Sequence, residues 1–181
     1  MKKILLVLAI LLSFQGFAQS FGKGSTRVHA GIGIGSPYIS SGTKMGVPPI
    51  HASFELGVTD KIGVGGLLGY TSSSIEEQFF TTSYSWKFSY LIVGARGAYH
   101  FLTDDKMDLY GGLMLGYNIA NARFESNDSS LNSFVTEPTA GGVAYGFFAG
   151  GRYNLKNNLA VFAELGYSIS WISAGVCFNI K

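Results

Sequence analysis

The sequence predicts an all-β chain that forms an eight-stranded antiparallel transmembrane up-and-down barrel. Three observations lead to this fold class. Charged residues make up only 13% of the chain, against about 25% in typical globular proteins. Beyond the N-terminus, no stretch stays apolar for the roughly 20 residues that a membrane helix needs. Apolar residues instead recur at every second position in eight segments, which is typical of strands that face lipid on one side.

The N-terminus, MKKILLVLAILLSFQGFAQS, has the layout of a secretory signal peptide. Two lysines precede an unbroken apolar run at 4–12, and Gly16 and Ala18 put small residues at the two positions that a signal peptidase reads. The apolar run is too short for a membrane anchor. We therefore expect a signal peptide at 1–18, cleaved after Ala18, and one mature barrel domain at 19–181.

Charge and cysteine usage narrow the possibilities further. Lys2 and Lys3 leave with the signal peptide, so the mature chain is formally neutral and has no basic surface for nucleic acid. Cys177 is the single cysteine, so no internal disulfide is expected.

The eight strands follow in order from the alternation. In the first, Val28, Ala30, Ile32 and Ile34 share the outward face, and Arg27 begins the inward face. Each segment is about ten residues long, the length that a tilted strand needs to cross a bilayer. The predicted strands cover residues 27–35, 50–59, 62–71, 90–101, 109–120, 142–153, 159–168 and 172–180.

The fourth strand carries one irregularity. Upstream of Tyr90, the aromatic residues Trp86 and Phe88 have the inward parity rather than the outward one. This pattern indicates either a β-bulge or a strand that continues above the membrane.

The connectors alternate in length, which is typical of barrels with short periplasmic turns and long external loops. Prolines are confined to the long connectors, as expected for a closed sheet without edge strands. Short turns are predicted at 60–61, 103–107 and 156–158, long loops at 36–49, 72–85 and 122–139, and a tight external hairpin at 169–171.

Aromatic residues on the outward face are predicted to form the two interfacial girdles of a membrane barrel. The external girdle would contain Tyr70, Tyr117, Tyr145, Tyr167 and Trp171, and the periplasmic girdle Tyr99, Phe101, Tyr153 and Phe178.

The stretch GIGIGSP, with Gly31, Gly33 and Gly35, raises the alternative of a phosphate-binding loop. A dinucleotide-binding loop has the spacing G-x-G-x-x-G and opens a helix, whereas here Ser-Pro follows and no helical pattern does. The glycines share the inward parity, so we interpret them as making room for large side chains in a narrow lumen.

The signal peptide ending FAQ, the eight strands and the last strand together resemble the small outer-membrane β-barrel proteins, the OmpA/OmpX-like and related outer membrane protein beta-barrel domain families. The last strand matches the insertion signal of such barrels at Ser173, Gly175, Phe178 and Ile180. Family members usually end on an aromatic residue, whereas this chain ends on Lys181.

This resemblance implies a location in the outer membrane of a Gram-negative bacterium. It also implies contact with outer-membrane lipid and lipopolysaccharide, and with the barrel-assembly machinery during insertion. Such families include passive barrels, adhesion and host-interaction proteins, and a few lipid-modifying enzymes. No cofactor is expected, and the sequence identifies no external ligand.

Five charged residues share the inward parity. Buried charges must be paired, and arginine can bind a carboxylate through two parallel hydrogen bonds. These residues predict an ionic plug, because eight strands leave little free bore; a narrow passive pore for small solutes is the alternative. The predicted lumenal charge network contains Arg27, Glu55, Arg96, Arg152 and Glu164.

One arrangement resembles an enzyme site. His51, Ser53 and Glu55 lie on one face of a predicted strand, and a His–Ser pair with a carboxylate can perform acyl transfer. The pair is also similar to the H-x-S motif of outer-membrane lipid A deacylases. Its parity points into the lumen, away from lipid, so we expect no catalysis, and a lipid A-modifying enzyme stays a second alternative. A metal site shared by the three histidines is not expected.

The expected function is therefore a structural or surface-interaction role without catalysis. External loops that are rich in Ser, Thr, Asn and aromatic residues would contact a partner. Phe79, Phe80 and Phe134 are the aromatic candidates for contact with a partner or a surface glycolipid, and packing of these rings against one another is the alternative.

Overall fold

The structure is a computed structural model that describes residues 21–40, 42–79, 82–126, 138–156 and 158–180. The predicted signal peptide lies outside these residues and stays a prediction. Within them, no helix has the length and apolar character needed to cross a membrane.

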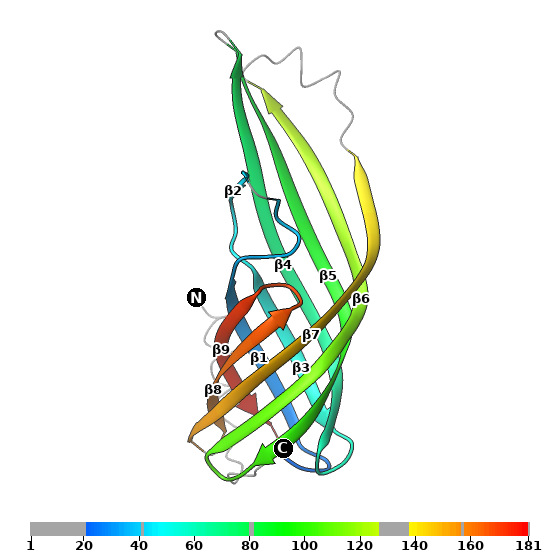
Figure 1. Cartoon of the computed structure of the whole chain (residues 1–181), viewed down its shortest axis with the longest axis vertical. Coiled ribbons are helices and arrows are strands. Elements are labelled where there is room, and N and C mark those ends of the chain that lie inside the picture. Colours follow the sequence, from blue (N-terminus) through cyan, green and yellow to red (C-terminus); the bar gives the residue numbers. More distant parts are fainter. Residues whose placement is uncertain (1–20, 41, 80–81, 127–137, 157, 181) are drawn as a thin grey trace, which may run out of the picture.

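The described chain forms an antiparallel sheet that closes on itself (Figure 1). β1 pairs with β3 on one side and with β9 on the other, and the remaining barrel strands pair in sequence order. All strands except the short β2 build the wall, so the predicted eight-stranded up-and-down barrel is confirmed. The strands are β1 (Thr26–Ile34), β2 (Lys44–Met45), β3 (Ile50–Gly57), β4 (Ile62–Phe79), β5 (Thr82–Thr103), β6 (Met107–Ser126), β7 (Thr139–Lys156), β8 (Leu159–Tyr167) and β9 (Ile172–Asn179).

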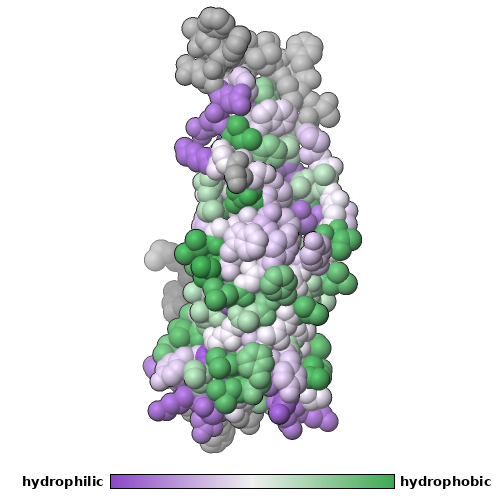
Figure 2. Space-filling view, in the orientation of Figure 1, coloured by the Kyte–Doolittle hydropathy of each residue, from purple (hydrophilic) through white to green (hydrophobic). Residues whose placement is uncertain are grey.

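The alternation in sequence becomes an alternation between the lumen and the outer wall. On β6, Met114 points inward and is buried, whereas Leu113 and Leu115 are 70% and 65% exposed. Figure 2 shows such apolar side chains over the middle and lower part of the molecule, between hydrophilic ends. A soluble protein rarely exposes so much contiguous apolar surface. Lipid is the environment that covers it.

The sequence-based lengths of the strands in the middle of the chain are wrong. Residues 72–85 were expected to be a loop, but β4 continues to Phe79 and β5 begins at Thr82. β6 likewise runs to Ser126, into the expected loop 122–139. The part of a strand that stands above the membrane needs no apolar outer face. Its polar residues therefore resemble a loop in sequence, although its backbone still forms hydrogen bonds with the neighbouring strands.

The irregularity near Trp86 also has an explanation. The register shift in the β5–β6 pair lies between His100 and Leu102, far from Trp86. Trp86 and Phe88 therefore belong to a strand that continues above the membrane, which was one of the two expected possibilities. We call residues 72–79, 82–89 and 121–126 the extension; it forms the tallest part of the molecule (Figure 1).

Candidate functional site

The periplasmic half of the lumen contains a network of buried ion pairs. Arg152 donates hydrogen bonds to Glu55 and, over 2.9 Å, to Asp108. Arg27 donates to the same oxygen of Asp108. His100 bridges the two carboxylates, with its Nδ1 at 2.7 Å from Asp108 Oδ1 and its Nε2 at 3.0 Å from Glu55 Oε1. The five side chains come from β1, β3, β5, β6 and β7, so the network links strands around the barrel.

A second set of contacts joins Arg96 and Glu164. The Arg96 guanidinium donates to Glu164 over 2.8 Å, and the Tyr110 hydroxyl donates to the same carboxylate oxygen over 2.9 Å. Arg96 also lies over the ring of Phe148 at 3.8 Å, and Arg152 lies over that of Tyr110 at 4.1 Å. Such cation–π contacts favour a charged guanidinium in a site with little water.

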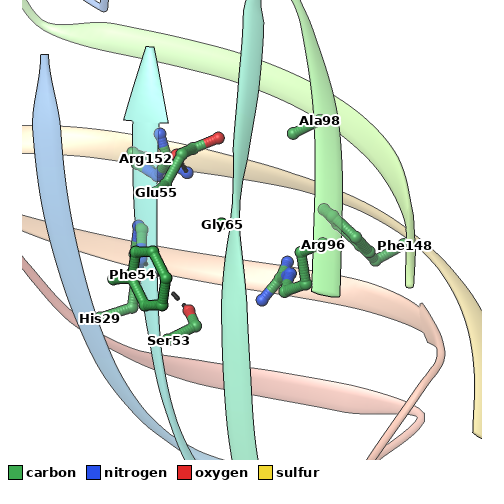
Figure 3. A pocket seen from close by; sticks show the side chains of 9 residues that line it. All are labelled: His29, Ser53, Phe54, Glu55, Gly65, Arg96, Ala98, Phe148 and Arg152. Carbon is green, nitrogen blue, oxygen red and sulfur yellow. Dashed lines mark hydrogen bonds and ion pairs between the residues drawn. The ribbon is translucent and has the colours of Figure 1, made fainter. Parts of the chain in front are cut away.

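The structure thus places all five expected network residues on the lumenal side, in two adjoining groups. Figure 3 shows Arg152 beside Glu55, with Arg96 on a neighbouring part of the wall. Asp108, His100 and Tyr110 also belong to the network, although the sequence pattern does not predict them as members. All three have the inward parity of their strands, but Asp108 is the second residue of β6 and falls between the predicted turn at 103–107 and the predicted strand at 109–120.

The network is capped from the periplasmic side by Phe21. Its ring stacks on the His100 imidazole with centroids 3.4 Å apart and lies 5.1 Å from the Arg27 guanidinium. The side chain is only 4% exposed. The space left among His29, Ser53 and the neighbouring network residues is about 10 Å³, no more than one water molecule needs. Solutes larger than water would have to displace these side chains.

An apolar layer fills the lumen above the charges. Leu67, Ile92, Met114, Ala144 and Ile169 pack together there. Ile169 comes from the tight connection between β8 and β9 and reaches into the lumen, where a side chain at Gly69 would collide with it. The inward glycines therefore make room for large neighbours.

The glycine-rich stretch serves the same purpose. A Cβ on Gly31 would approach the His51 ring to 2.7 Å and the Phe162 ring to 2.9 Å. Gly35 then ends β1 with a φ of +65°, a conformation that favours glycine.

The three candidate catalytic residues share the inward face of β3, but they do not form a triad. Ser53 Oγ lies 3.3 Å from Nδ1 of His29, not of His51 (Figure 3). Glu55 is bound by Arg152 and His100. Neither ring nitrogen of His51 has a hydrogen-bond partner in the described structure. Among all the residues that the structure describes, no three His, Cys, Asp or Glu residues are grouped as metal ligands would be.

The extension carries a cluster of aromatic side chains on the face that continues the lumenal side. The rings of Trp86 and Phe124 have centroids 5.1 Å apart, and Tyr84 stacks on Phe124 at 6.3 Å. Phe88 stacks on Trp86 at 6.5 Å. All four side chains are half-buried. The expected contact residues Phe80 and Phe134, and the side chain of Phe79, lie outside the described residues.

The sequence profile described as "Outer membrane protein beta-barrel domain" matches residues 4–175. The chain belongs to this family. A search of curated proteins finds no match by sequence.

Two solved β-barrel structures share the fold of this chain. Ail, the attachment invasion locus protein of Yersinia pestis, solved with the heparin analogue sucrose octasulfate, has 18% sequence identity and a TM-score of 0.50. That match covers 88% of this chain and 95% of Ail. The N-terminal barrel of Pseudomonas aeruginosa OprF has 17% identity and a TM-score of 0.50, over 87% of this chain and 98% of that domain. The protein is thus an outer-membrane β-barrel of the Gram-negative type.

Within this outer-membrane barrel protein, the expected girdle residues lie on the outer wall. Tyr145 and Tyr167 stack at 5.9 Å, and Trp171 packs edge-on against Tyr167 at 5.2 Å. At the periplasmic end, Tyr99 and Phe101 lie 6.5 Å apart. The residues of the expected insertion signal lie on β9 and just after it, where β9 pairs with β1 and closes the barrel.

Proposed function

We propose that this protein is a cell-surface interaction protein, in which a filled barrel anchors an external sheet that contacts a partner. The aromatic cluster of the extension is the observation that carries the proposal. Trp86 and Phe124 hold a large apolar area on a sheet that stands outside the membrane. Half-buried aromatic patches of this kind mark binding surfaces, because a partner that covers them removes a large apolar area from water.

The opposite face of the extension is charged and hydroxyl-bearing. Lys87 binds Glu125, and Lys44 lies 3.6 Å from Glu76. The Lys87 ammonium lowers the pKa of the Glu125 carboxyl. The two faces thus differ in chemistry, which favours a partner that docks on the aromatic side.

Adhesion of cells that display the protein tests the proposal. The variant Trp86→Ala, Phe124→Ala should reduce attachment to coated surfaces, with heparin and extracellular-matrix proteins as the first coatings. Ser85→Ala, on the other face of the same strand, is the matched control and should attach like the wild type. Equal attachment of the double variant and the wild type would refute the proposal.

The alternative of a passive pore has less support. Charged and apolar layers both fill the lumen, and Phe21 caps the lower layer. Liposomes containing the protein should swell in a small sugar no faster than empty liposomes. Faster swelling would favour the pore.

A further inference from the structure

The protonation state of His100 follows from the two carboxylates beside it. Its Nδ1 lies 2.7 Å from Asp108 and its Nε2 lies 3.0 Å from Glu55. Arginine side chains bind both carboxylates as well, so each carboxylate is ionised and only accepts hydrogen bonds. A neutral imidazole has one N–H and would turn a bare nitrogen toward one of these oxygens. His100 therefore donates from both nitrogens, as an imidazolium cation.

With His100 as a cation, the charges in this part of the lumen do not balance. Between the Phe21 cap and the apolar layer, the described residues supply four cations but three carboxylates. Protonation of His29 or His51 would only add to the surplus. An uncompensated charge in a space with so little water is strongly unfavourable. The cations are Arg27, Arg96, His100 and Arg152, and the carboxylates are Glu55, Asp108 and Glu164.

Hydrogen-bond donors are in surplus in the same place. Nη2 of Arg27, Nε of Arg152 and Nε2 of His29 are buried nitrogen atoms without a partner in the described structure. The three residues are 1%, 4% and 4% exposed, so they are shielded from bulk water. Among the described residues, no carboxylate oxygen of the network is a buried atom without a partner. An anion would supply both the acceptor and the negative charge.

The small cavity of the network lies beside two of these donors. Arg152 and His29 line it together with Ser53 and Arg96, and the four side chains come from four different strands (Figure 3). Ser53 Oγ lies 3.3 Å from Nδ1 of His29. When the hydroxyl donates to that nitrogen, Nε2 carries the hydrogen and needs an acceptor. The volume of about 10 Å³ holds one particle of about the size of a water molecule. Chloride is slightly larger, and Arg96, the least buried of the network cations, would move slightly to admit it.

We propose that this cavity binds one small monovalent anion of the size of chloride, which accepts hydrogen bonds from Nε of Arg152 and Nε2 of His29. Arg96 supplies a second guanidinium beside the anion. Glu55 also lines the cavity, but its two oxygens are bound by Arg152 and His100. A water molecule would accept the same hydrogen bonds but would leave the surplus charge in place. The site belongs to the plug, so it is independent of the partner of the extension.

The dependence of folding stability on bromide concentration tests this site, because bromide is close to chloride in size. The barrel is unfolded with urea in lipid vesicles while bromide replaces gluconate, an anion too large for the cavity, at constant ionic strength. If unfolding releases one anion, each tenfold rise in bromide above its dissociation constant should raise the folding equilibrium constant about tenfold. Lys61→Gln removes a positive charge at an exposed periplasmic turn and is the control. It should show the same dependence as the wild type.

Two substitutions of Ser53 test the cavity itself. Ser53→Asp places a carboxylate where the anion would lie, so this variant should fold without any dependence on bromide. Ser53→Asn has nearly the same size but brings no charge. It should therefore be the less stable of the two, which is the reverse of the usual cost of burying a carboxylate.

A substitution outside the cavity tests the charge count. His100→Gln removes the surplus charge, and the two hydrogens of its amide nitrogen can still be donated to both carboxylates. This variant should also lose the dependence on bromide. Heat-modifiable migration on gels checks that each variant is folded, and either variant alone suffices for the comparison.

Two results would overturn the proposal. One is a wild-type folding constant that does not change with bromide, which would identify water as the occupant of the cavity. The other is an undiminished bromide dependence in Ser53→Asp or in His100→Gln, which would assign the effect to the outer surface or to the lipid.

Discussion

Replacing Asp108 by asparagine tests the lumenal network most directly. Asp108 is 1% exposed and accepts hydrogen bonds from Arg27 and Arg152, while His100 lies 2.7 Å away. Asparagine keeps the shape but removes the charge. Arg152 retains Glu55, whereas Arg27 contacts no other carboxylate in the described part of the chain.

The expected loss of unfolding free energy follows from that uncompensated guanidinium. Breaking a buried ion pair by removing one partner costs about 3–5 kcal/mol. With a urea dependence of roughly 1–3 kcal/mol/M, the unfolding midpoint should fall by about 1 M or more. Tryptophan fluorescence of the barrel in lipid vesicles measures it, and Asp105→Asn at an exposed turn position is the control.

A double variant separates ion pairing from packing. If the unpaired Arg27 guanidinium is what destabilises the Asp108→Asn variant, adding Arg27→Met should recover part of the unfolding free energy. The coupling energy between the two substitutions should be about 1–3 kcal/mol. A loss below about 1 kcal/mol for Asp108→Asn alone, within the range of exposed pairs, would refute the reasoning.

Other predictions address the seam, a turn and the question of catalysis. Gly175→Ala should lower the yield of folded barrel on heat-modifiability gels, because its Cβ would collide with a β1 carbonyl oxygen; wild-type yield would contradict this. Asp104 accepts backbone hydrogen bonds, above all from Met107 at 2.7 Å, which lower the pKa of its carboxyl. The ionised Asp104 carboxyl should stabilise the turn fully at pH values above its ordinary pKa, and this stabilisation should be lost as the pH falls through the lowered pKa of the folded state. A midpoint at or above 3.8 in an NMR titration of Asp104 would exclude this. His51→Ala and Ser53→Ala should leave lipid A acylation unchanged by mass spectrometry, and an acyl loss in the wild type that either variant reverses would favour the enzyme.

The eight strands could be predicted because every second residue of a membrane-spanning strand faces lipid and is apolar. The side chains on the inward and outward faces must differ in polarity or size wherever lipid contacts the wall. The alternation alone therefore assigns Leu113 to the outer face and Met114 to the lumen, as the structure has them. Above the membrane this constraint ends. The outward face of the extension can be polar there, so the sequence pattern of residues 72–85 predicts a loop where the structure has paired strands.

The network could be predicted only as a set of inward charges. Parity places Arg27 and Glu55 on the lumenal side, but which partners meet depends on strand tilt and on the register around the barrel. Asp108 could not be predicted as a member because it lies at the end of a strand, where the alternation no longer marks the inward face. The contact of Phe21 with His100 joins residues far apart in sequence, and no local pattern signals it.

The long sequence separation within the ion network has a consequence for folding kinetics. Arg27 and Asp108 are 81 residues apart, and Arg152 and Glu55 are 97 apart. Such contacts carry a high cost in chain entropy before they gain any energy. Local hairpins can therefore form first, while the charges stay hydrated. The network assembles only when both halves of the chain come together, so the step that dries the lumen is also the step that closes the barrel.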